Sequence, residues 1–401
     1  MTSPDRSYNE RHNRPDRLQL AALAGLIFLG AAFVFSATAA TQPSALTWYH
    51  QMWVHQVIWY LLGIGAGVAL CLVDYHALIR WSYVIYWATI VCLAAVLFIG
   101  TVHGGARRWI DLKVFEFQPS EFAKLAFILA SANFLSRPAE ELRQYDVFWK
   151  GIGLMVLPFL LILKEPDLGS ALVLAPTGLG MMLVAGVPRR YLLKLCAAAG
   201  ILGALFIADI LFAPPGWQVR MQEYQRQRLL VYFGADFAPA NATPGERAQA
   251  RELQFERSYQ GRQALISVGS GGLLGKGWGR GSQTALGFLP PGAAHNDFIF
   301  SVIAEEEGFV GSVLVLALYA VILFTGLRIA GQARDRLGKL VAAGIVMLLF
   351  SHVFINIGMN IRIVPVTGIP LPLLSYGGSS VLCSLIALGL MQNVHIHRKG
   401  Y

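Results

Sequence analysis

The segment AAHNDFIFSVIAEEEGFVG, residues 293–311, joins a helix-capping pair, a carboxylate and an apolar run within one short stretch. Asn296 and Asp297 are residue types preferred at helix N-termini. The apolar residues that follow predict a membrane span over about 298–327, since roughly 20 residues cross a hydrocarbon core of about 30 Å. Three more acids, at 305–307, lie about two turns into that span. The segment therefore predicts a lipid-spanning helix that carries charge for a structural or a chemical reason.

The composition of the whole chain agrees with a membrane-embedded fold. Of its 401 residues, 55% are hydrophobic and only 14% are charged, and the mean hydropathy is +0.54. These values exclude an ordinary soluble domain. In hydrocarbon the backbone must bond to itself, and the Leu-, Ala- and Gly-rich blocks lack the alternation of barrel strands. We therefore predict an all-α polytopic membrane protein with ten transmembrane helices, at about 18–40, 56–74, 79–101, 120–136, 150–164, 168–187, 192–213, 298–327, 339–361 and 374–394.

The distribution of Lys and Arg predicts the orientation. An even number of spans puts both termini on one side, and the loops on that side carry more basic residues than the short loops opposite. Basic residues collect on the cytoplasmic side. We therefore predict a cytoplasmic tail over 1–17, a membrane domain over 18–396 and a cytoplasmic end over 397–401. The long segment 214–296, between the seventh and eighth spans, is then extracytoplasmic.

The outer segment 214–296 has an excess of positive charge and two helical patterns. Apolar and basic residues, among them Arg226 and Arg228, recur at helical spacing over 217–233, which predicts a helix lying at the membrane interface. Residues 250–269 predict a second helix.

A glycine-rich run, GSGGLLGKGWGRGSQ, follows at 269–283. It matches neither a Walker A loop nor a dinucleotide fingerprint, so we expect no nucleotide cofactor. Its Lys276 and Arg280, together with backbone amides, suit contact with the pyrophosphate of a lipid substrate.

Asp297 has two interpretations. Its carboxylate either caps the following helix, or acts as a general base at the boundary of water and lipid, where it would accept the proton of a sugar hydroxyl within about 3 Å. His295 either positions a substrate or completes a turn. The acids at 305–307 cannot share one face at about 100° per residue, so at least one points into the bundle or a wet cavity. They are either packing acids or a cation or proton site.

A second group of charges lies in HGGARRWIDLKVFEFQPSEFAKLAF, residues 103–127. Glu121 and Lys124 form an i,i+3 pair of opposite charge inside a predicted span, where two ions are costly unless paired. The pair is either a structural bridge between helices or part of a functional site. Arg108, flanked by Arg107 and Trp109, predicts an anion-binding and anchoring cluster on the preceding outer loop.

The stretch PVTGIPLPLLSYGGSS, residues 365–380, predicts irregular backbone before the last span, because it holds three prolines and a glycine pair. At membrane depth such backbone must line protein or water. Ser375 in this stretch is therefore a candidate for supporting a substrate.

Several motifs together resemble the SEDS family, the FtsW/RodA/SpoVE group. The resemblance runs in order and spacing from Trp109 to the C-terminus, whereas the first two spans match only in hydropathy. GIPLPLLSYGG and HIHRK are closer to the RodA branch than to the division protein FtsW. The matching motifs are WIDLKVFEFQPSEFAKL, KEPDLGSALV, YQRQR, GSGGLLGKGWGRGSQ, HNDFIFSVIAEEEGFVG, NIGMNIRIVPVTGIPLPLLSYGGSS and HIHRK.

This resemblance implies a peptidoglycan glycosyltransferase of the bacterial inner membrane that polymerises lipid II during cell-wall elongation and rod-shape maintenance. Asp297 falls on the family's catalytic aspartate, and Glu121 with Lys124 falls on its Glu-x-x-Lys membrane pair. The implied partner is a class B penicillin-binding protein, a PBP2-like transpeptidase, with membrane lipids around both; no nucleic acid is implied. The residues expected to bind or support the substrate are Glu121, Lys124, Arg108, Arg226, Arg228, Lys276, Arg280, His295 and Ser375.

Two departures from the family pattern affect loop geometry. FLPPGAAHND, residues 288–297, has two extra residues, lacks the family's glutamate and carries Asn296 in place of threonine. The segment 234–258 is also longer than usual, and Glu307 replaces an apolar residue. The role of the family's glutamate therefore does not transfer to this chain.

The resulting hypothesis is that Asp297 deprotonates the acceptor's GlcNAc 4-hydroxyl, which attacks the anomeric carbon of the donor's MurNAc on the periplasmic side. Arginines of the outer segment or a divalent cation, Mg²⁺ or Mn²⁺, would stabilise the departing pyrophosphate. Three alternatives stay open: a lipid II flippase or transporter, an FtsW-like septal polymerase, and a scaffold that only activates the transpeptidase.

Overall fold

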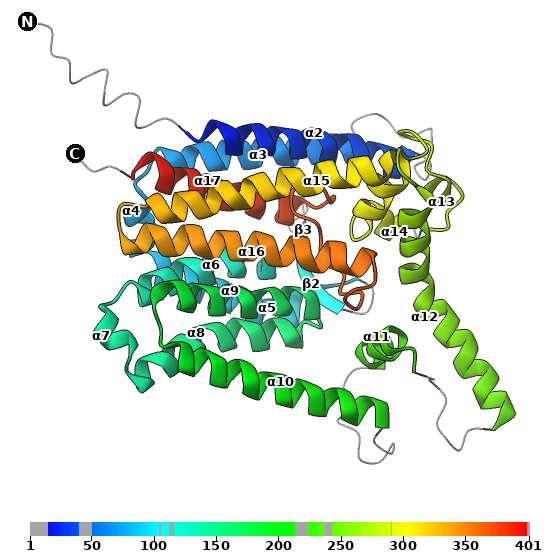
Figure 1. Cartoon of the computed structure of the whole chain (residues 1–401), viewed down its shortest axis with the longest axis horizontal. Coiled ribbons are helices and arrows are strands. Elements are labelled where there is room, and N and C mark those ends of the chain that lie inside the picture. The colour runs from blue at the N-terminus through cyan, green and yellow to red at the C-terminus, as the bar shows by residue number, and fades with distance from the viewer. Residues whose placement is uncertain are drawn as a thin grey trace, which may run out of the picture.

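The computed structural model describes residues 15–39, 50–103, 106–111, 116–212, 223–235, 237, 243–289 and 291–398. Within these ranges the chain forms a bundle of long helices that run side by side (Figure 1). The long helices are α2 (Arg17–Ala39), α3 (Met52–Cys71), α5 (Ser82–Ile99), α6 (Pro119–Leu135), α8 (Tyr145–Lys164), α9 (Leu168–Ala185), α10 (Arg189–Phe212), α15 (Ile299–Gln332), α16 (Arg336–Asn360) and α17 (Gly378–Ile396).

Every predicted span coincides with one of these helices, and the all-α membrane fold is confirmed. Among the described residues, nine helices are long and apolar enough to cross a membrane. The predicted span at 120–136 corresponds to α6, which has 17 residues and is not among the nine. The count of ten therefore stays a prediction.

α6 is enclosed by the rest of the bundle. It begins at Pro119, whose fixed φ suits the first turn and whose missing N–H costs no hydrogen bond there. Ala123, Ala126 and Ala130 are all buried, and their small side chains allow close packing against α5, α9 and α16. α16 and α17 are also mostly buried, so α6, α16 and α17 form the centre of the bundle.

The two ends of the described chain meet at one end of the bundle (Figure 1). The backbone N–H of Asp16 donates to the Gln392 side chain on α17 across 2.9 Å, and its carboxylate pairs with Arg328 on α15. The predicted tail and C-terminal end lie largely outside the described residues. The first residues of α15 and α17 and the last residues of α16, with the segment 361–377 that joins α16 to α17, lie at the opposite end (Figure 1).

The outer segment contains more structure than the sequence predicted. α11 (Glu223–Phe233) and α12 (Pro244–Ser270) confirm the two expected helices, although 217–222 lies outside the described residues and α12 begins before the predicted residue 250. The short helices α13 (Ser282–Ala285) and α14 (Pro291–Ala294) follow. Two more short helices, α4 (Tyr75–Arg80) and α7 (Ala139–Leu142), lie at the other end of the bundle.

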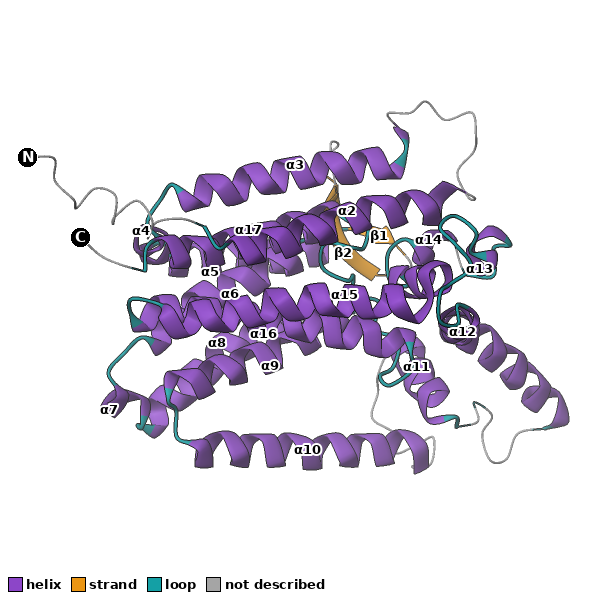
Figure 2. Cartoon of the chain, turned by 45° about the horizontal axis from the view of Figure 1, so that its top comes forward, coloured by secondary structure: helices purple, strands orange, loops and turns teal. Residues whose placement is uncertain are grey.

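A small antiparallel sheet was not predicted. Its strands, in the order β1-β2-β3, are β1 (Thr101–His103), β2 (Ala106–Asp111) and β3 (Glu116–Phe117). It joins α5 to α6 and carries Arg108 on its middle strand. Figure 2 shows this sheet among the outer helix ends, whereas α10 runs along the margin with only Leu192 and Ile210 buried.

Candidate active site

Asp297 lies in the turn between α14 and α15, and it does not cap the helix. The N-cap position of α15 is Phe298, and no side chain makes a capping hydrogen bond there. The capping interpretation of Asp297 is therefore wrong. The turn instead leaves Asp297 partly exposed, at the end of the bundle opposite the described chain ends.

The backbone around Asp297 is held at three successive carbonyl groups. The carbonyl of His295 accepts from the backbone N–H of Tyr376 across 2.9 Å. The carbonyl of Asn296 accepts from the Ser375 hydroxyl across 2.5 Å. The carbonyl of Asp297 accepts two hydrogen bonds from side chains of α16. Because each donor comes from another element, the position of this turn depends on tertiary contacts.

Two buried asparagines on α16 hold the Asp297 carbonyl. Asn356 Nδ2 donates to it across 3.0 Å and also to the carbonyl of Ile369 across 2.8 Å. Asn360 Nδ2 donates to the same Asp297 oxygen across 3.2 Å, while its own Oδ1 accepts from Ser301 across 2.5 Å. The amides thus connect the start of α15 to the segment 367–370, which we call the strap.

The strap lies directly against the Asp297 carboxylate. Gly368 has a φ of +75°, and a Cβ on it would lie 3.3 Å from Asp297 Oδ2. Glycine is favoured here because the left-handed backbone disfavours side chains, and because an added Cβ would push the Asp297 carboxylate by a few tenths of an ångström.

Protein surrounds the Asp297 carboxylate despite its partial exposure. Desolvation raises its pKa to about 6, although the charges of Arg228 and Arg108 lower it and that of Asp167 raises it. A carboxylate with this pKa is mostly ionised at neutral pH, and it is a stronger base than an exposed aspartate. General bases work best when their pKa lies near the working pH.

Arg108 links the small sheet to the turn between α8 and α9. Its guanidinium donates to the backbone carbonyls of Glu165, across 3.2 Å, and of Pro166. Glu165 is fully buried, and burial raises its pKa to about 9, helped by the Asp167 charge and opposed by Arg108. Asp167 caps α9 by accepting from Ser170 N across 3.1 Å.

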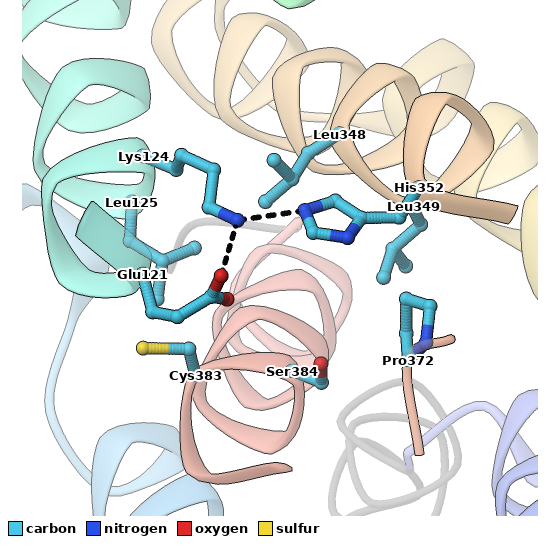
Figure 3. Close-up of a pocket in the computed structure, with 9 residues that line it drawn as sticks. All are labelled: Glu121, Lys124, Leu125, Leu348, Leu349, His352, Pro372, Cys383 and Ser384. Atoms are coloured by element: carbon cyan, nitrogen blue, oxygen red, sulfur yellow. Dashed lines mark hydrogen bonds and ion pairs between the residues drawn. The ribbon is translucent and has the colours of Figure 1, made fainter. Parts of the chain in front are cut away.

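The buried pair Glu121 and Lys124 lies below the strap. Lys124 Nζ is 2.6 Å from Glu121 Oε1 and 2.8 Å from His352 Nε2 (Figure 3). An ammonium has only donors, so Nε2 must accept and the ring proton lies on Nδ1. Nδ1 then points to the carbonyl of Pro370 in the strap, 3.4 Å away. The ion pair is therefore connected to the strap through a neutral imidazole.

Sequence reasoning missed the polar face of α16. His352, Asn356 and Asn360 recur every four residues along an otherwise apolar span. This spacing places them on one helical face. This alignment of polar residues inside a predicted span was the sequence signal that could have identified them as part of the site.

The glycine-rich run 269–283 binds the deep acids. Glu305 accepts from Lys276 Nζ across 2.5 Å, and Glu306 accepts from the backbone N–H of Gly279 across 2.9 Å. Both glutamates are buried. They act as packing acids that attach this loop to α15, and Lys276 is one of their partners.

The structure separates the predicted site residues into groups. Asp297 experiences the charges of Arg108 and Arg228, and His295 and Ser375 adjoin it through backbone bonds. Lys276 and the exposed Arg280 belong to the glycine-rich loop, further along α15. Arg226 lies on α11, two positions before Arg228.

A metal site made only of protein groups is absent from the described part of the chain. No group of three His, Cys, Asp or Glu side chains there could hold an ion. Mg²⁺ often uses only one or two carboxylates and binds chiefly substrate phosphates and water.

Comparison with known proteins gives matches along nearly the whole chain. The family model FTSW_RODA_SPOVE, described as "Cell cycle protein", matches residues 16–400. The chain is 38% identical over 321 residues to "Peptidoglycan glycosyltransferase MrdB" of Escherichia coli (strain K12), covering 80% of this chain and 79% of that protein. It is 34% identical over 384 residues to "Stage V sporulation protein E" of Bacillus subtilis (strain 168), covering 95% and 96%.

Solved structures show the same fold. A chain from a peptidoglycan synthase complex, studied for the coordination of polymerization and crosslinking, aligns with a TM-score of 0.76 at 28% identity, covering 96% of this chain and 98% of that one. The rod shape-determining protein RodA of Thermus thermophilus aligns with a TM-score of 0.65 at 28% identity, covering 96% and 98%.

Proposed function

The chain belongs to the FtsW/RodA/SpoVE family, and on this premise we propose that it is a peptidoglycan glycosyltransferase that polymerises lipid II during cell-wall elongation and rod-shape maintenance. The observation that carries the assignment of the general base is the setting of Asp297. Its carboxylate is partly accessible, has a pKa of about 6, and lies on a turn held at three successive carbonyls.

The reaction needs a positioned base more than a strong acid. Asp297 accepts the proton of the GlcNAc 4-hydroxyl as that oxygen bonds to the anomeric carbon of MurNAc. The bond from this carbon to the phosphate oxygen breaks, and undecaprenyl pyrophosphate leaves with the electron pair. Arg108 and Arg228, whose charges already act at Asp297, stabilise the negative charge of the leaving group.

The partner and the membrane placement follow from the same reasoning. The similar chain in a complex that coordinates polymerization and crosslinking supports a class B penicillin-binding protein as the partner of this chain. We place the protein in the bacterial inner membrane with both termini in the cytoplasm, because the described chain ends lie together and the basic loops lie on their side. Asp297, at the opposite end, then faces the periplasm.

The transporter alternative is weaker because the charged side chains deep in the bundle are already bound to other protein groups. A transporter places its binding charges near the midplane, whereas the deep charges Glu121, Lys124 and Glu305 are bound to protein groups. The septal polymerase would carry the same chemistry. A depletion strain separates the two, because this chain should restore rod shape and leave a division defect uncorrected.

A polymerisation assay tests the function. Purified chain with labelled lipid II and its partner should make glycan, and Asp297→Asn should reduce the rate by roughly 10²–10⁴-fold, the usual loss for a general base. The exposed Asp146 gives a matched control, since Asp146→Asn should polymerise normally. Chelation by EDTA, with Mg²⁺ or Mn²⁺ restored, tests the cation. Normal synthesis by Asp297→Asn would support the scaffold alternative instead.

A further inference from the structure

Arg362 occupies a backbone position that normally requires glycine. It follows the C-cap residue of α16, Ile361, and has a φ of +59°. Its N–H bonds to the carbonyl of Met359, and the N–H of Ile363 bonds to that of Gly358. These two bonds define a Schellman motif, whose left-handed residue is usually glycine and sometimes asparagine.

An arginine at this position costs backbone strain that glycine would avoid. Arg362 makes no compensating side-chain hydrogen bond or ion pair with the described residues, and its side chain is exposed. Strain of this kind often marks a functional site. The side chain, rather than the backbone, is then the reason for an arginine here.

Arg362 lines a groove outside the end of α16. One wall is α11, with Arg228 and Tyr232, and another is α12, with Ser258. The floor is the segment 362–366. Tyr232 fixes α11 to this segment by donating to the Ile363 carbonyl across 2.6 Å. Two arginines therefore line one groove, and none of the described residues that line it is acidic.

Two contacts link the groove to the turn that carries Asp297. Arg228 Nη1 donates to the carbonyl of Thr367 across 3.4 Å. Thr367 precedes Gly368, which lies against Asp297 Oδ2. An anion bound between Arg228 and Arg362 would therefore lie near the strap, which contacts Asp297, where the sugars are proposed to react.

We propose that this groove binds the diphosphate of a lipid-linked saccharide, with Arg228 at its inner end and Arg362 at its outer end. The forked guanidinium donors match phosphate oxygens in geometry and charge. This inference rests on the proposed polymerase function. The diphosphate belongs either to the donor, where it is the leaving group, or to the acceptor, where it stays attached.

Arg362→Gly tests the side chain without harming the fold. Glycine prefers this φ, so the variant should unfold at the same or a higher temperature than the parent. In the polymerisation assay it should raise KM for lipid II by about tenfold and weaken inhibition by inorganic pyrophosphate by a similar factor. Arg362→Lys keeps the positive charge, so it should raise KM and weaken pyrophosphate inhibition less than Arg362→Gly does. Arg251→Ala, an exposed arginine of α12 outside the groove, is the matched control.

A steric variant tests the groove independently. A Cβ on Gly261 would lie 3.5 Å from Val366 Cγ2. Gly261→Ala should therefore be tolerated, whereas Gly261→Leu should fill the groove and raise KM as Arg362→Gly does.

Two lipid II analogues identify the source of the diphosphate. An analogue without the GlcNAc 4-hydroxyl can serve only as a donor, and one with a non-cleavable phosphonate can serve only as an acceptor. Weaker binding of either analogue to Arg362→Gly supports the proposal and names the source. Unchanged binding of both, or unchanged inhibition by pyrophosphate despite a raised KM, overturns it. If the parent protein makes no glycan, the proposed function fails, and direct binding of pyrophosphate to parent and Arg362→Gly still decides the groove.

Discussion

The side-chain amide nitrogen of Asn356 lies 3.0 Å from the backbone carbonyl oxygen of Asp297 and donates a hydrogen bond to it. The same nitrogen holds the carbonyl of Ile369. One buried amide thus fixes the distance between Asp297 and the strap that lies against it. Asp297 is held through its backbone carbonyl, and the hydrogen bond leaves its carboxylate unused.

Replacing this amide should lower kcat with little change in KM. Asn356→Leu keeps the size but removes the side-chain donor to the Ile369 carbonyl and one of the two donors to the Asp297 carbonyl. The carboxylate should therefore shift, and kcat should fall on the order of 10²-fold. Asn133, near the C-terminal end of α6, offers a control, because its side-chain amide donates to Ser82 Oγ across 2.9 Å. Asn133→Leu should lower the unfolding temperature and preserve kcat. Equal losses of kcat in both variants would show that Asn356 acts only on stability.

The rate should depend on pH through Asp297. Its pKa of about 6 means that kcat/KM falls as pH drops below 6, because the base becomes protonated. The charge of Arg228 lowers this pKa, so Arg228→Gln should move the acid limb of the pH profile to higher pH. Arg251→Gln should leave the limb in place. A shift to lower pH would contradict the electrostatic assignment.

Gly368 should be intolerant of a methyl group for a reason specific to the site. Gly368→Ala and Gly234→Ala both place alanine at a positive φ, +75° and +68°, and each should cost about 1–2 kcal/mol of stability. The two sites differ in surroundings: the added Cβ meets Asp297 Oδ2 at the first and open space at the second. Only Gly368→Ala should lower the polymerisation rate in the lipid II assay. Loss of activity in Gly234→Ala as well would assign the effect to backbone strain alone.

The free energy of unfolding should fall more when the buried ion pair loses one charge than when it loses both. Glu121→Gln leaves the Lys124 ammonium without its counter-ion at 1% exposure, which should lower the free energy of unfolding by about 3–5 kcal/mol. The double variant Glu121→Gln with Lys124→Met removes both charges and should recover most of that loss. Thermal unfolding in detergent measures both. A double variant as unstable as the single one would contradict the pairing argument.

Glu165 should make stability fall as pH rises. Burial and the Asp167 charge raise its pKa from 4.5 to about 9, so the folded state holds a proton that the unfolded state releases above about pH 4.5. The folded state then binds more protons, and the free energy of unfolding decreases with rising pH up to about 9. Glu165→Gln mimics the neutral form, so its stability advantage should grow between pH 5 and 9. An advantage independent of pH would show that Glu165 is ionised in the fold.

The local sequence was sufficient for the helices, and it predicted Asp297 as the general base. Long apolar runs must be helices in lipid, so each predicted span coincides with a helix. Asp297 was identified by its place before an apolar run and by the family motif around it. Its carboxylate could not be distinguished from a helix cap, because that distinction depends on the backbone of the turn.

Contacts between distant segments could not be predicted in the same way. Lys276 was expected to meet phosphate, but in the fold its ammonium is bound to Glu305. His352 and Arg362 had no predicted role, because one depends on a lysine 228 positions away and the other on the φ of a single residue.

The amino-acid order by itself determined which segments enter lipid and where a carboxylate emerges from it, because hydrophobic length and helical periodicity are properties of consecutive residues. Only the tertiary structure decided which buried charges are already bound and which groups remain available to a substrate. Desolvation and hydrogen bonding depend on what lies nearby in space, and here α16, the strap and Arg108 bring those neighbours to Asp297.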